Sequence, residues 1–324
     1  MQNGFGHLYA GAECILPLRI LFLREFEKLM FNRFFIFFVL LIMLCSLCAC
    51  SSKSTTEVST RETMNEVQIP VETEKEEKDY IIPVLLYHNL DDNYTVGNHI
   101  TNISPSLFEE HMLGLLERGY NPIFVSDYYE YINDGKELPE NPIMVTFDDG
   151  YLSNYEYAYP ILKKLNIPAT IFVVTSTVGE EVSGGKVNTP HFTWEQAKEM
   201  QDSGIIDIQS HSYSHKNMSL ISESVLNDEL SFSLRDLNEH IPKEVSIFAY
   251  PYGGYNDKTL EKVIEVGYDM QVLVTNVESN LKYLAVNSVN GLDKFSRLTV
   301  SGDMSVRDLY DMIDDSVSNV KLNS

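Results

Sequence analysis

Two short segments of the chain carry residue types that can perform acid–base or metal chemistry. The first is Thr146-Phe147-Asp148-Asp149-Gly150, in which two adjacent carboxylates precede a glycine. At a turn both carboxylates can address one site in different roles, since one can bind a metal ion while the other accepts a proton. The alternative is an Asp-Gly turn that does no more than cap the next helix. This segment alone leaves both interpretations open.

The second segment, His211-Ser212-Tyr213-Ser214-His215, carries two imidazoles four residues apart. On a helical turn such residues face the same way. With one remote carboxylate they would form a set of two histidines and one aspartate with open coordination positions, as catalytic zinc sites keep. Two unrelated surface histidines are the alternative. Thiolate ligands are excluded after Cys50, because all four cysteines lie at or before that position.

Alternating strands and helices must position these two segments. Short apolar runs predict strands at Pro83–Tyr87, Pro122–Val125, Ile143–Phe147, Thr170–Val174, Ile205–Gln209, Val245–Tyr250 and Met270–Val274. Helical patterns predict helices at Pro105–Arg118, Asn154–Leu165, Trp194–Ser203, Glu223–His240, Asp257–Glu265 and about Ser305–Val317. Such alternation is typical of parallel βαβ units. The sequence therefore predicts an α/β fold, a distorted or incomplete (β/α)7-type barrel.

Barrels of this kind carry their chemistry at the carboxyl ends of the strands. His88 follows the first predicted strand, the Asp148–Asp149 pair the third, the two histidines the fifth, and Pro251-Tyr252-Gly253 the sixth. We therefore expect these residues to meet at one rim of the barrel.

Three motifs resemble those of the polysaccharide deacetylase family, the NodB-homology domain of carbohydrate esterase family 4. They are Thr146–Gly150, His211–His215 and Phe248–Gly253, in the family's order and at similar spacing. The resemblance runs from about Ile82 to Val317. Tyr87-His88, Thr193-Trp194 and the segment around Arg297 are further similar to the branch that deacetylates extracellular poly-N-acetylglucosamine.

The resemblance implies an enzyme that removes N-acetyl groups from a β-linked N-acetylglucosamine polymer. It implies that Asp148 is the general base and that the backbone N–H of Tyr252 helps to hold the oxyanion. It also implies that one divalent metal ion is bound by Asp149, His211 and His215. Zn²⁺ is the expected ion, and Co²⁺, Ni²⁺, Mn²⁺ or Fe²⁺ also suit two imidazoles and a carboxylate.

The chain departs from the commonest family pattern in two places. Ala249 stands where the third motif usually has an arginine, and no Leu-x-His motif near the C-terminus supplies a general acid. In the poly-N-acetylglucosamine branch an early histidine takes the acid role, and His88 matches that description; a structural histidine is the alternative. Arg297 is the candidate to replace the missing arginine and orient Asp148, and a surface or helix-facing arginine is the alternative.

Aromatic side chains are candidates for the sugar groove, because an aromatic face suits the apolar face of a pyranose. Trp194 is the only tryptophan of the chain, and a core anchor at the start of its helix is the alternative role. Tyr213 is the second candidate. Other functions compatible with the motifs are a peptidoglycan N-acetylglucosamine deacetylase, a xylan O-acetyl esterase and a surface carbohydrate-binding protein that has lost catalysis.

Residues 30–79 are expected to target and tether the protein. The basic start at Met30 and the apolar run Phe34–Leu44 predict a signal peptide over residues 30–49, because the run is short for a membrane-spanning helix. It ends in Leu47-Cys48-Ala49-Cys50, which resembles the lipobox of bacterial lipoproteins with Cys50 as the lipidated residue. An uncleaved signal anchor is the alternative.

The chain is thus divided into four parts. Residues 1–29 are expected to be an upstream extension, and residues 50–79 a disordered linker, since they lack the apolar residues that offset ordering entropy. Residues 80–324 form the expected catalytic domain. The protein would be exported and lipid-anchored at the outer face of a bacterial cell membrane, with secretion or a signal anchor as the alternatives.

The charge of the chain restricts its partners. With 24 Lys+Arg against 47 Asp+Glu, the formal net charge is −23 at pH 7. Nucleic acid is an unsuitable partner for such a chain, because phosphate neutralisation needs clustered cations. Contact with the membrane is expected through the lipid anchor only. An acetylated glycan polymer fits this charge, and the sequence defines no protein partner.

Overall fold

The computed structural model describes residues 80–93, 100–183, 188–243, 245–274, 286–287 and 297–323. The upstream extension, the signal peptide, Cys50 and the linker that the sequence predicts lie outside these residues. Among the helices in the described ranges, none combines the length and the apolar character needed to cross a bilayer.

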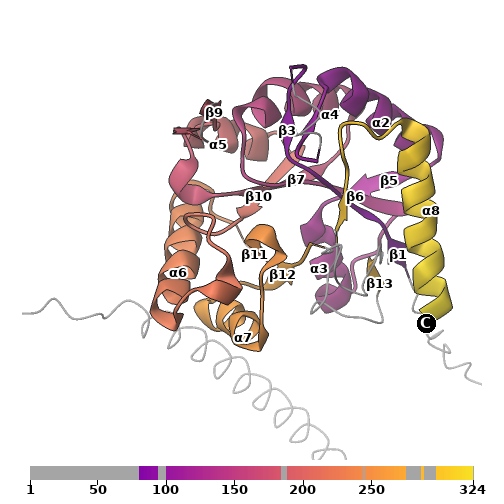
Figure 1. Cartoon of the computed structure of the whole chain (residues 1–324). Coiled ribbons are helices and arrows are strands. Elements are labelled where there is room, and N and C mark those ends of the chain that lie inside the picture. Colours follow the sequence, from indigo (N-terminus) through magenta and orange to yellow (C-terminus); the bar gives the residue numbers. More distant parts are fainter. Residues whose placement is uncertain are drawn as a thin grey trace, which may run out of the picture. The chain divides into compact units, whose positions relative to one another are not determined.

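A curled sheet of eight parallel strands forms the centre of the fold (Figure 1). Its strands follow the order β12 (Met270–Val272), β11 (Ile247–Ala249), β10 (Ile206–Ser210), β7 (Ala169–Val173), β6 (Pro142–Phe147), β2 (Val84–Tyr87) and β14 (Leu298–Thr299). The eighth strand, β5 (Asn121–Ile123), pairs with the first half of β6. Within the described residues β12 and β14 do not pair, so the barrel is open between them.

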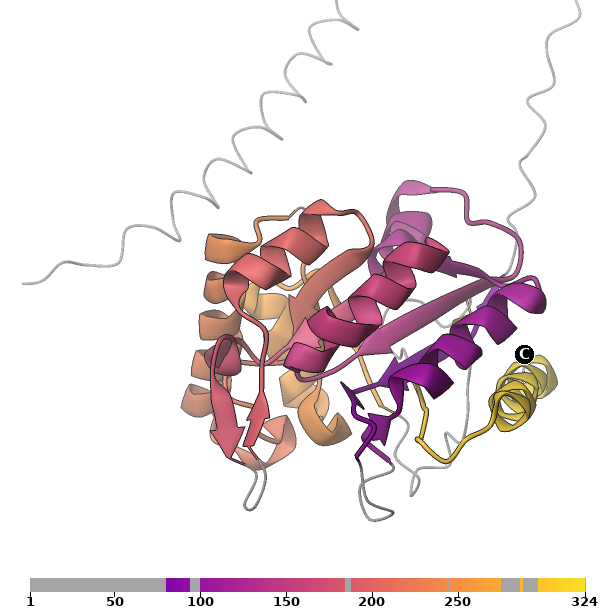
Figure 2. The same ribbon diagram turned by 90° about the horizontal axis from the view of Figure 1, so that it is seen from above.

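Most helices lie on the outside of this sheet, and one, Val125–Asp134, packs against its concave side (Figures 1 and 2). The helices are α2 (Pro105–Glu117), α3 (Val125–Asp134), α4 (Tyr159–Leu165), α5 (Trp194–Asp202), α6 (Glu223–His240), α7 (Asp257–Val266) and α8 (Val306–Asn323). A π-helical turn, η2 (Asn154–Ala158), precedes α4. Three 3₁₀ turns are η3 (Thr175–Thr177), η4 (Met218–Leu220) and η5 (Pro251–Gly253).

Short strands lie beside the main sheet. β1 (Ile81–Ile82) pairs with β13 (Val286–Asn287), β3 (Asn89–Leu90) with β4 (Asn102–Ile103), and β8 (Glu181–Ser183) with β9 (Asn188–Pro190).

Alternate side chains of the strands pack on opposite faces of the sheet, as the period of two in an extended chain requires. Leu85 and Val145 join the largest buried cluster, which includes Phe108 of α2. The preceding residues, Val84 and Met144, join a second cluster with Phe172, Ile247 and Val272. That cluster contains side chains from strands far apart in the sheet order, so it fills the concave side of the curled sheet. Both faces are therefore covered, which is typical of parallel sheets.

The predicted α/β barrel is confirmed, and the differences are local. Every predicted strand and helix has a counterpart, but Val125 begins α3 rather than ending a strand, and α3 was not predicted. The backbone N–H of Phe124 donates to Asp127 Oδ2 at 2.8 Å, and this contact stabilises the start of α3. The helix predicted over Asn154–Leu165 opens with the π turn η2, and the last helix continues to Asn323. The two-residue strand β14 is too short to produce a periodic pattern.

Candidate active site

The structure brings Asp149, His211 and His215 together at the carboxyl ends of β6 and β10. Each offers one ligand atom, and these atoms lie within 4.8 Å of one another. Nε2 of His215 is 3.2 Å from Oδ1 of Asp149, and Nε2 of His211 is 3.8 Å from the same oxygen. These three residues are the set that the sequence predicts for metal binding.

The two histidines meet through a loop and not through a helical turn, so that part of the prediction was wrong. Residues 211–215 have no helical structure, and Ser212 (φ 71°) and His215 (φ 58°) adopt the left-handed conformation. The backbone N–H of His215 donates to Ser212 Oγ at 3.0 Å, which closes the loop. The two imidazole centroids are 5.0 Å apart. Left-handed conformations of non-glycine residues persist only where surrounding contacts hold them, and they concentrate at functional sites.

Glu229 of α6 holds this loop from behind. Its side chain is buried, and its Oε2 accepts a hydrogen bond from the backbone N–H of Ser214 at 2.7 Å. Its Oε1 accepts from Ser214 Oγ at 2.5 Å and pairs with Lys216 Nζ at 2.6 Å. A buried carboxylate with these partners stays ionised and fixed, because the charge-assisted hydrogen bonds compensate its loss of water.

The tautomer of His211 can be assigned from its outer contact. Its Nδ1 is 2.9 Å from the carbonyl oxygen of Ala249. A carbonyl only accepts, so Nδ1 carries the hydrogen and Nε2 presents its lone pair to the carboxylates. Burial lowers the pKa of His211 to about 4, against the opposing charge of Asp148, so the imidazole is neutral at neutral pH. A neutral imidazole oriented by a backbone carbonyl is the form that binds a divalent metal. The donor set therefore fits such an ion.

Asp149 is held at a strained turn. Its φ is 73°, and the following Gly150 also has a positive φ of 82°. A Cβ at Gly150 would lie 3.1 Å from Cγ1 of Val173, so glycine is needed there for conformation and for space. Burial, and then the nearby carboxylate of Asp149, raise the pKa of the Tyr151 hydroxyl, so this hydroxyl lies beside Asp149. This turn lets Asp149 face the histidines while Asp148 faces the barrel interior.

Arg297 forms a two-pronged ion pair with Asp148. Its Nη1 is 2.6 Å from Oδ1 and its Nη2 is 2.7 Å from Oδ2. Both side chains are almost fully buried. Arg297 directly precedes β14 in the chain, and its side chain lies in the barrel interior. Its guanidinium carbon lies over the ring of Phe172, 5.0 Å from the ring centroid. Arg297 thus contacts Asp148 directly, and its role in orienting this carboxylate stays a prediction.

Arg297 also connects the two ends of the open sheet. Its Nε donates to the carbonyl oxygen of Leu273, which follows β12, at 3.2 Å. Arg297 itself precedes β14, the strand at the other end of the sheet order. One guanidinium therefore bridges the gap in the barrel and also binds a carboxylate at the site. Arginine can make both contacts because its donors form a planar fork, whereas lysine has a single ammonium group.

The charge state of Asp148 follows from this contact. Burial acts to raise its pKa, but the charge of Arg297, then that of His211, and the hydrogen bonds from Arg297 outweigh burial and lower the pKa to about 2. Asp148 is therefore ionised at neutral pH. Its Oδ2 lies 3.6 Å from Nε2 of His211, so it adjoins the candidate metal ligands without belonging to that set.

His88, the candidate acid, follows β2 on the strand next to β6. The π turn η2 holds its backbone, because Asn154 Nδ2 donates to the His88 carbonyl at 2.8 Å. Nδ1 of His88 is buried and has no hydrogen-bond partner within the described part of the chain. A positive charge on His88 would lower the pKa of Asp148, which places the two side chains near each other. The acid role of His88 stays a prediction.

Tyr252 lies at the rim in η5, with φ 58°. Among the described residues none accepts a hydrogen bond from its backbone N–H, so this donor is available, as an oxyanion site requires. Its hydroxyl is 3.1 Å from Nδ1 of His215. The predicted oxyanion role concerns the backbone only, and the contact of the side chain was not expected.

The two groove candidates pack against α6. The ring of Trp194 stacks on His240, with 4.5 Å between centroids and 7° between planes, and it adjoins the largest buried cluster. Tyr213 packs edge-on against Phe232 at 5.5 Å. Neither ring contact involves the histidines of the candidate metal site, so the groove role of these two residues stays a prediction.

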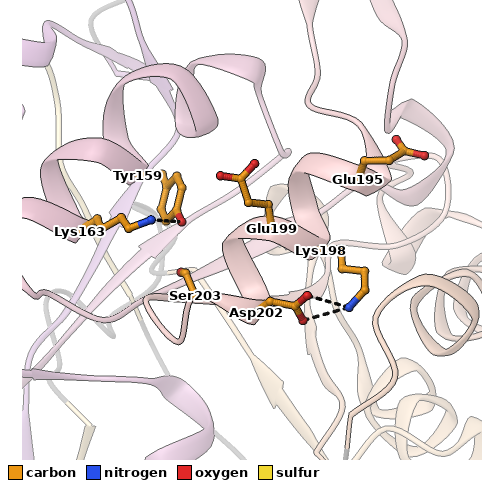
Figure 3. Close-up of a pocket in the computed structure, with 7 residues that line it drawn as sticks. All are labelled: Tyr159, Lys163, Glu195, Lys198, Glu199, Asp202 and Ser203. Atoms are coloured by element: carbon orange, nitrogen blue, oxygen red, sulfur yellow. Dashed lines mark hydrogen bonds and ion pairs between the residues drawn. The ribbon is translucent and has the colours of Figure 1, made fainter.

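A pocket elsewhere on the surface lies between α4 and α5 (Figure 3). It is lined by Tyr159, Lys163, Glu195, Lys198, Glu199, Asp202 and Ser203. Lys198 pairs with Asp202 at 2.8 Å, and Lys163 donates to the Tyr159 hydroxyl at 3.0 Å. This pocket contains none of the predicted site residues, and the ion pair between two of its own lining residues is Lys198–Asp202.

Sequence reasoning missed three contributors to the site. These are the carboxylate of Glu229, the hydroxyl of Tyr151 and the carbonyl of Ala249, each of which contacts a ligand or its loop. A buried carboxylate on α6 has a signal in the sequence, since Glu229 lies between apolar Leu226 and Leu230 on the buried side of that helix. The contact of Ala249 is made by its backbone carbonyl, which every residue has, so the residue type does not indicate it.

The comparisons with known proteins agree with this geometry. Residues 135–271 match the sequence model of the family described as polysaccharide deacetylase. YxkH of Bacillus subtilis (strain 168), assigned by name to the polysaccharide deacetylases, is 32% identical over 198 residues, 61% of this chain and 66% of that protein. The poly-beta-1,6-N-acetyl-D-glucosamine N-deacetylase of Staphylococcus aureus (strain MRSA252) is 29% identical over 56% of this chain and 66% of its own length.

A solved structure shares the fold. The Streptococcus pyogenes deacetylase PplD, determined in complex with acetate, superposes with a TM-score of 0.61 at 26% identity, over 73% of this chain and 99% of that one. The fold and the strand-end site define a distorted barrel of the deacetylase type. Residues 135–271 are similar in sequence to polysaccharide deacetylases, and the described residues share the fold of one of them. The chain spans 66% of the length of the two sequence relatives, slightly less than two thirds of each.

Replacing His211 with alanine should abolish metal binding. It removes one of three ligands, so the purified variant should retain no ion after dialysis, whereas the parent protein should hold about one per chain, as three-ligand sites do. Elemental analysis by mass spectrometry measures this. His240→Ala, at an exposed histidine of α6, is the matched control and should keep its metal. Unchanged metal content in the His211 variant would refute the ligand assignment.

Replacing Arg297 with methionine should destabilise the protein in a pH-dependent way. In the parent, the folded pKa of Asp148 (about 2) is below its ordinary value of 3.8, so this pair stabilises the fold above pH 3.8 and loses that effect as the pH falls through 2. Without Arg297, burial raises the pKa, and an uncompensated carboxylate costs about 3–5 kcal/mol at neutral pH.

The deficit relative to the parent should shrink as the pH falls toward 3.8, because protonation removes the unpaired charge. Urea unfolding at neutral pH and at several lower pH values measures this. Arg307→Met, at an exposed arginine of α8, should leave the free energy of unfolding unchanged. A deficit that is the same at every pH would contradict the role of Asp148 in it.

Proposed function

We propose that the protein is a metal-dependent hydrolase that removes N-acetyl groups from extracellular poly-N-acetylglucosamine or a related exopolysaccharide. The observation that carries this proposal is the pairing of a candidate metal triad with an ionised carboxylate, Asp148, fixed by Arg297 at its side. Amide hydrolysis needs a base, stabilisation of negative charge on oxygen, and a proton for the leaving amine. The rim of this barrel offers a group suited to each task.

Similar proteins support the choice of substrate. The Staphylococcus aureus relative is named for N-deacetylation of poly-beta-1,6-N-acetyl-D-glucosamine, and this chain covers most of that protein's length. The departures from the commonest family pattern point the same way. Ala249 replaces the usual arginine, while Arg297 approaches Asp148 from the other end of the sheet.

The chain's own residues divide the proposed reaction between them. When bound by the triad, a divalent ion supplies polarisation of the acyl carbonyl and activation of water, and Zn²⁺ is the ion we propose. Asp148 is ionised and accepts the proton of the attacking water. Arg297 keeps both carboxylate oxygens in place during this transfer. The backbone N–H of Tyr252 donates to the oxygen that becomes negative.

His88 is proposed to protonate the leaving amine. It lies one strand from Asp148, and its Nδ1 has no protein partner within the described residues. Departure of an amine as an anion is prohibitive in water, so a positioned acid is required. Asn154 fixes the backbone of His88 and thereby limits the movement of the ring relative to the rest of the site.

The proposed location is the outer face of a bacterial cell membrane, with Cys50 as the lipidated residue. An extracellular polymer is accessible there, and the acidic linker would keep the catalytic domain away from anionic lipids. Cys50→Ser should abolish incorporation of radiolabelled fatty acid and move the protein from the membrane pellet to the medium. If the Cys50→Ser variant still incorporated fatty acid and stayed in the membrane pellet, the proposed lipid anchor at Cys50 would be wrong. Cys45→Ser is the matched control and should behave as the parent.

Release of acetate from defined polymers tests the activity. The purified catalytic domain, loaded with zinc, should release acetate from poly-β-1,6-N-acetylglucosamine, and a chelator should stop the release. Asp148→Asn should lower the rate by about 10²–10⁴-fold, the usual contribution of a general base, while keeping its metal. Asp228→Asn, at an exposed carboxylate of α6, should match the parent.

Peptidoglycan and acetylated xylan serve as comparison substrates in the same assay. Faster release from either of them would replace the proposed substrate while leaving the hydrolase class intact. No release from any of the three would favour a carbohydrate-binding protein without catalysis.

A further inference from the structure

The side chain of Tyr252 contacts a candidate metal ligand although most of it is exposed. Its hydroxyl is 3.1 Å from Nδ1 of His215, and the two ring centroids are 4.6 Å apart at an interplanar angle of 54°. Its relative exposure is 68%, high for a large aromatic residue. Burial of apolar surface does not explain why an exposed ring lies at this rim, hydrogen-bonded to a candidate ligand histidine.

The hydrogen-bond inventory assigns the direction of this contact. Nε2 of His215 faces Asp149 at 3.2 Å, so Nε2 is the atom that would present its lone pair to an ion. A neutral imidazole carries one hydrogen, which must then be on Nδ1. In that state His215 donates and the Tyr252 oxygen accepts. The tyrosine keeps its own hydroxyl hydrogen.

The two histidines of the triad differ in what holds them. His211 is buried, and its Nδ1 bonds to the backbone carbonyl of Ala249. His215 is the more exposed of the two, and its outer partner is a side chain. Contacts of Ser212 and Glu229 anchor the backbone of the His215 loop but leave rotation of the imidazole ring undetermined. Two contacts of the ring itself bear on this rotation: Nε2 with Asp149 and Nδ1 with the Tyr252 hydroxyl.

Packing around η5 keeps Tyr252 in place. The backbone N–H groups of Gly253 and Gly254 donate to the carbonyls of Tyr250 and Pro251, which closes a tight turn. A Cβ at Gly254 would lie 2.1 Å from Oδ1 of Asn217, so this turn sits directly against the segment that follows the His215 loop. The hydroxyl of Tyr252 and the ring of His215 are therefore held by two segments in direct contact.

We propose that the hydroxyl of Tyr252 positions His215 for metal binding, in addition to the backbone role proposed for the same residue. An outer hydrogen bond of this kind fixes the ring orientation and tautomer and makes the ligand nitrogen more basic. The inference rests on the metal site within the proposed function. It does not depend on the identity of the glycan.

Tyr252→Phe tests the inference, because it removes the hydroxyl and keeps the ring and the backbone N–H. The affinity for Zn²⁺, measured by competition with a chromophoric chelator and without any glycan, should fall by about 10- to 100-fold, as for other outer partners of ligand histidines. Tyr255→Phe is the matched control. Tyr255 is a partly exposed tyrosine three residues further on, whose ring contact is with Tyr250, so its loss should leave the affinity unchanged.

The absorption spectrum of the Co²⁺-loaded protein is the second measurement, since its visible bands respond to ligand geometry. The bands should shift in Tyr252→Phe and not in Tyr255→Phe, while the free energy of unfolding without metal stays equal in both. Zinc affinity within twofold of the parent and an unshifted spectrum would overturn the inference and leave the proposed function standing. A parent protein that binds neither ion would overturn both.

Discussion

The buried ion pair of Arg297 and Asp148 is the interaction on which the rest of the structure depends. Both side chains are almost completely removed from water, and two charges in such a place are tolerable only when they neutralise each other with good geometry. The same guanidinium donates to Leu273 beyond the other end of the sheet. The bridge across the open barrel and the charge state of the proposed base thus depend on the same guanidinium. A change that moved β14 relative to β12 would disturb Asp148 as well.

The candidate metal site depends on backbone conformations that the chain adopts only under constraint. Asp149, Ser212, His215 and Tyr252 all have positive φ values without being glycine. Each such conformation is unfavourable for an L-residue by about 1–3 kcal/mol. Contacts from outside the turns compensate for this, among them the Glu229 carboxylate on the His215 loop and the Gly254–Asn217 packing beside Tyr252. Contacts made by α6 therefore help to stabilise the unfavourable backbone conformations of the site.

Much of this arrangement could be predicted from the sequence, and the remainder has physical reasons for escaping prediction. Apolar runs and their spacing are sufficient to predict the parallel strands other than β14. Polar residues that follow these strands are sufficient to predict a common rim, which is where Asp149 and His211 lie. The conformation of the His211–His215 loop was predicted wrongly because local spacing favours a helical turn, while distant contacts from Ser176 and Glu229 decide the outcome. The path of Arg297 through the interior depends on the two-residue strand β14, which has no periodicity.

The exposed fraction of the side chains increases from one side of the site to the other, which indicates the side that is open to a substrate. The side chains of Asp148 and His211 are each 3% exposed, Asp149 is 14% exposed and His215 29%. Tyr252 continues this gradient outward at the rim. A polymer too large to enter the barrel must therefore approach from the side of His215 and Tyr252, whereas Asp148 is fixed from the opposite side by Arg297. The proposed base is held by its buried ion pair with Arg297, whereas the least buried of the proposed ligands is held by a hydrogen bond at the surface that the substrate would contact.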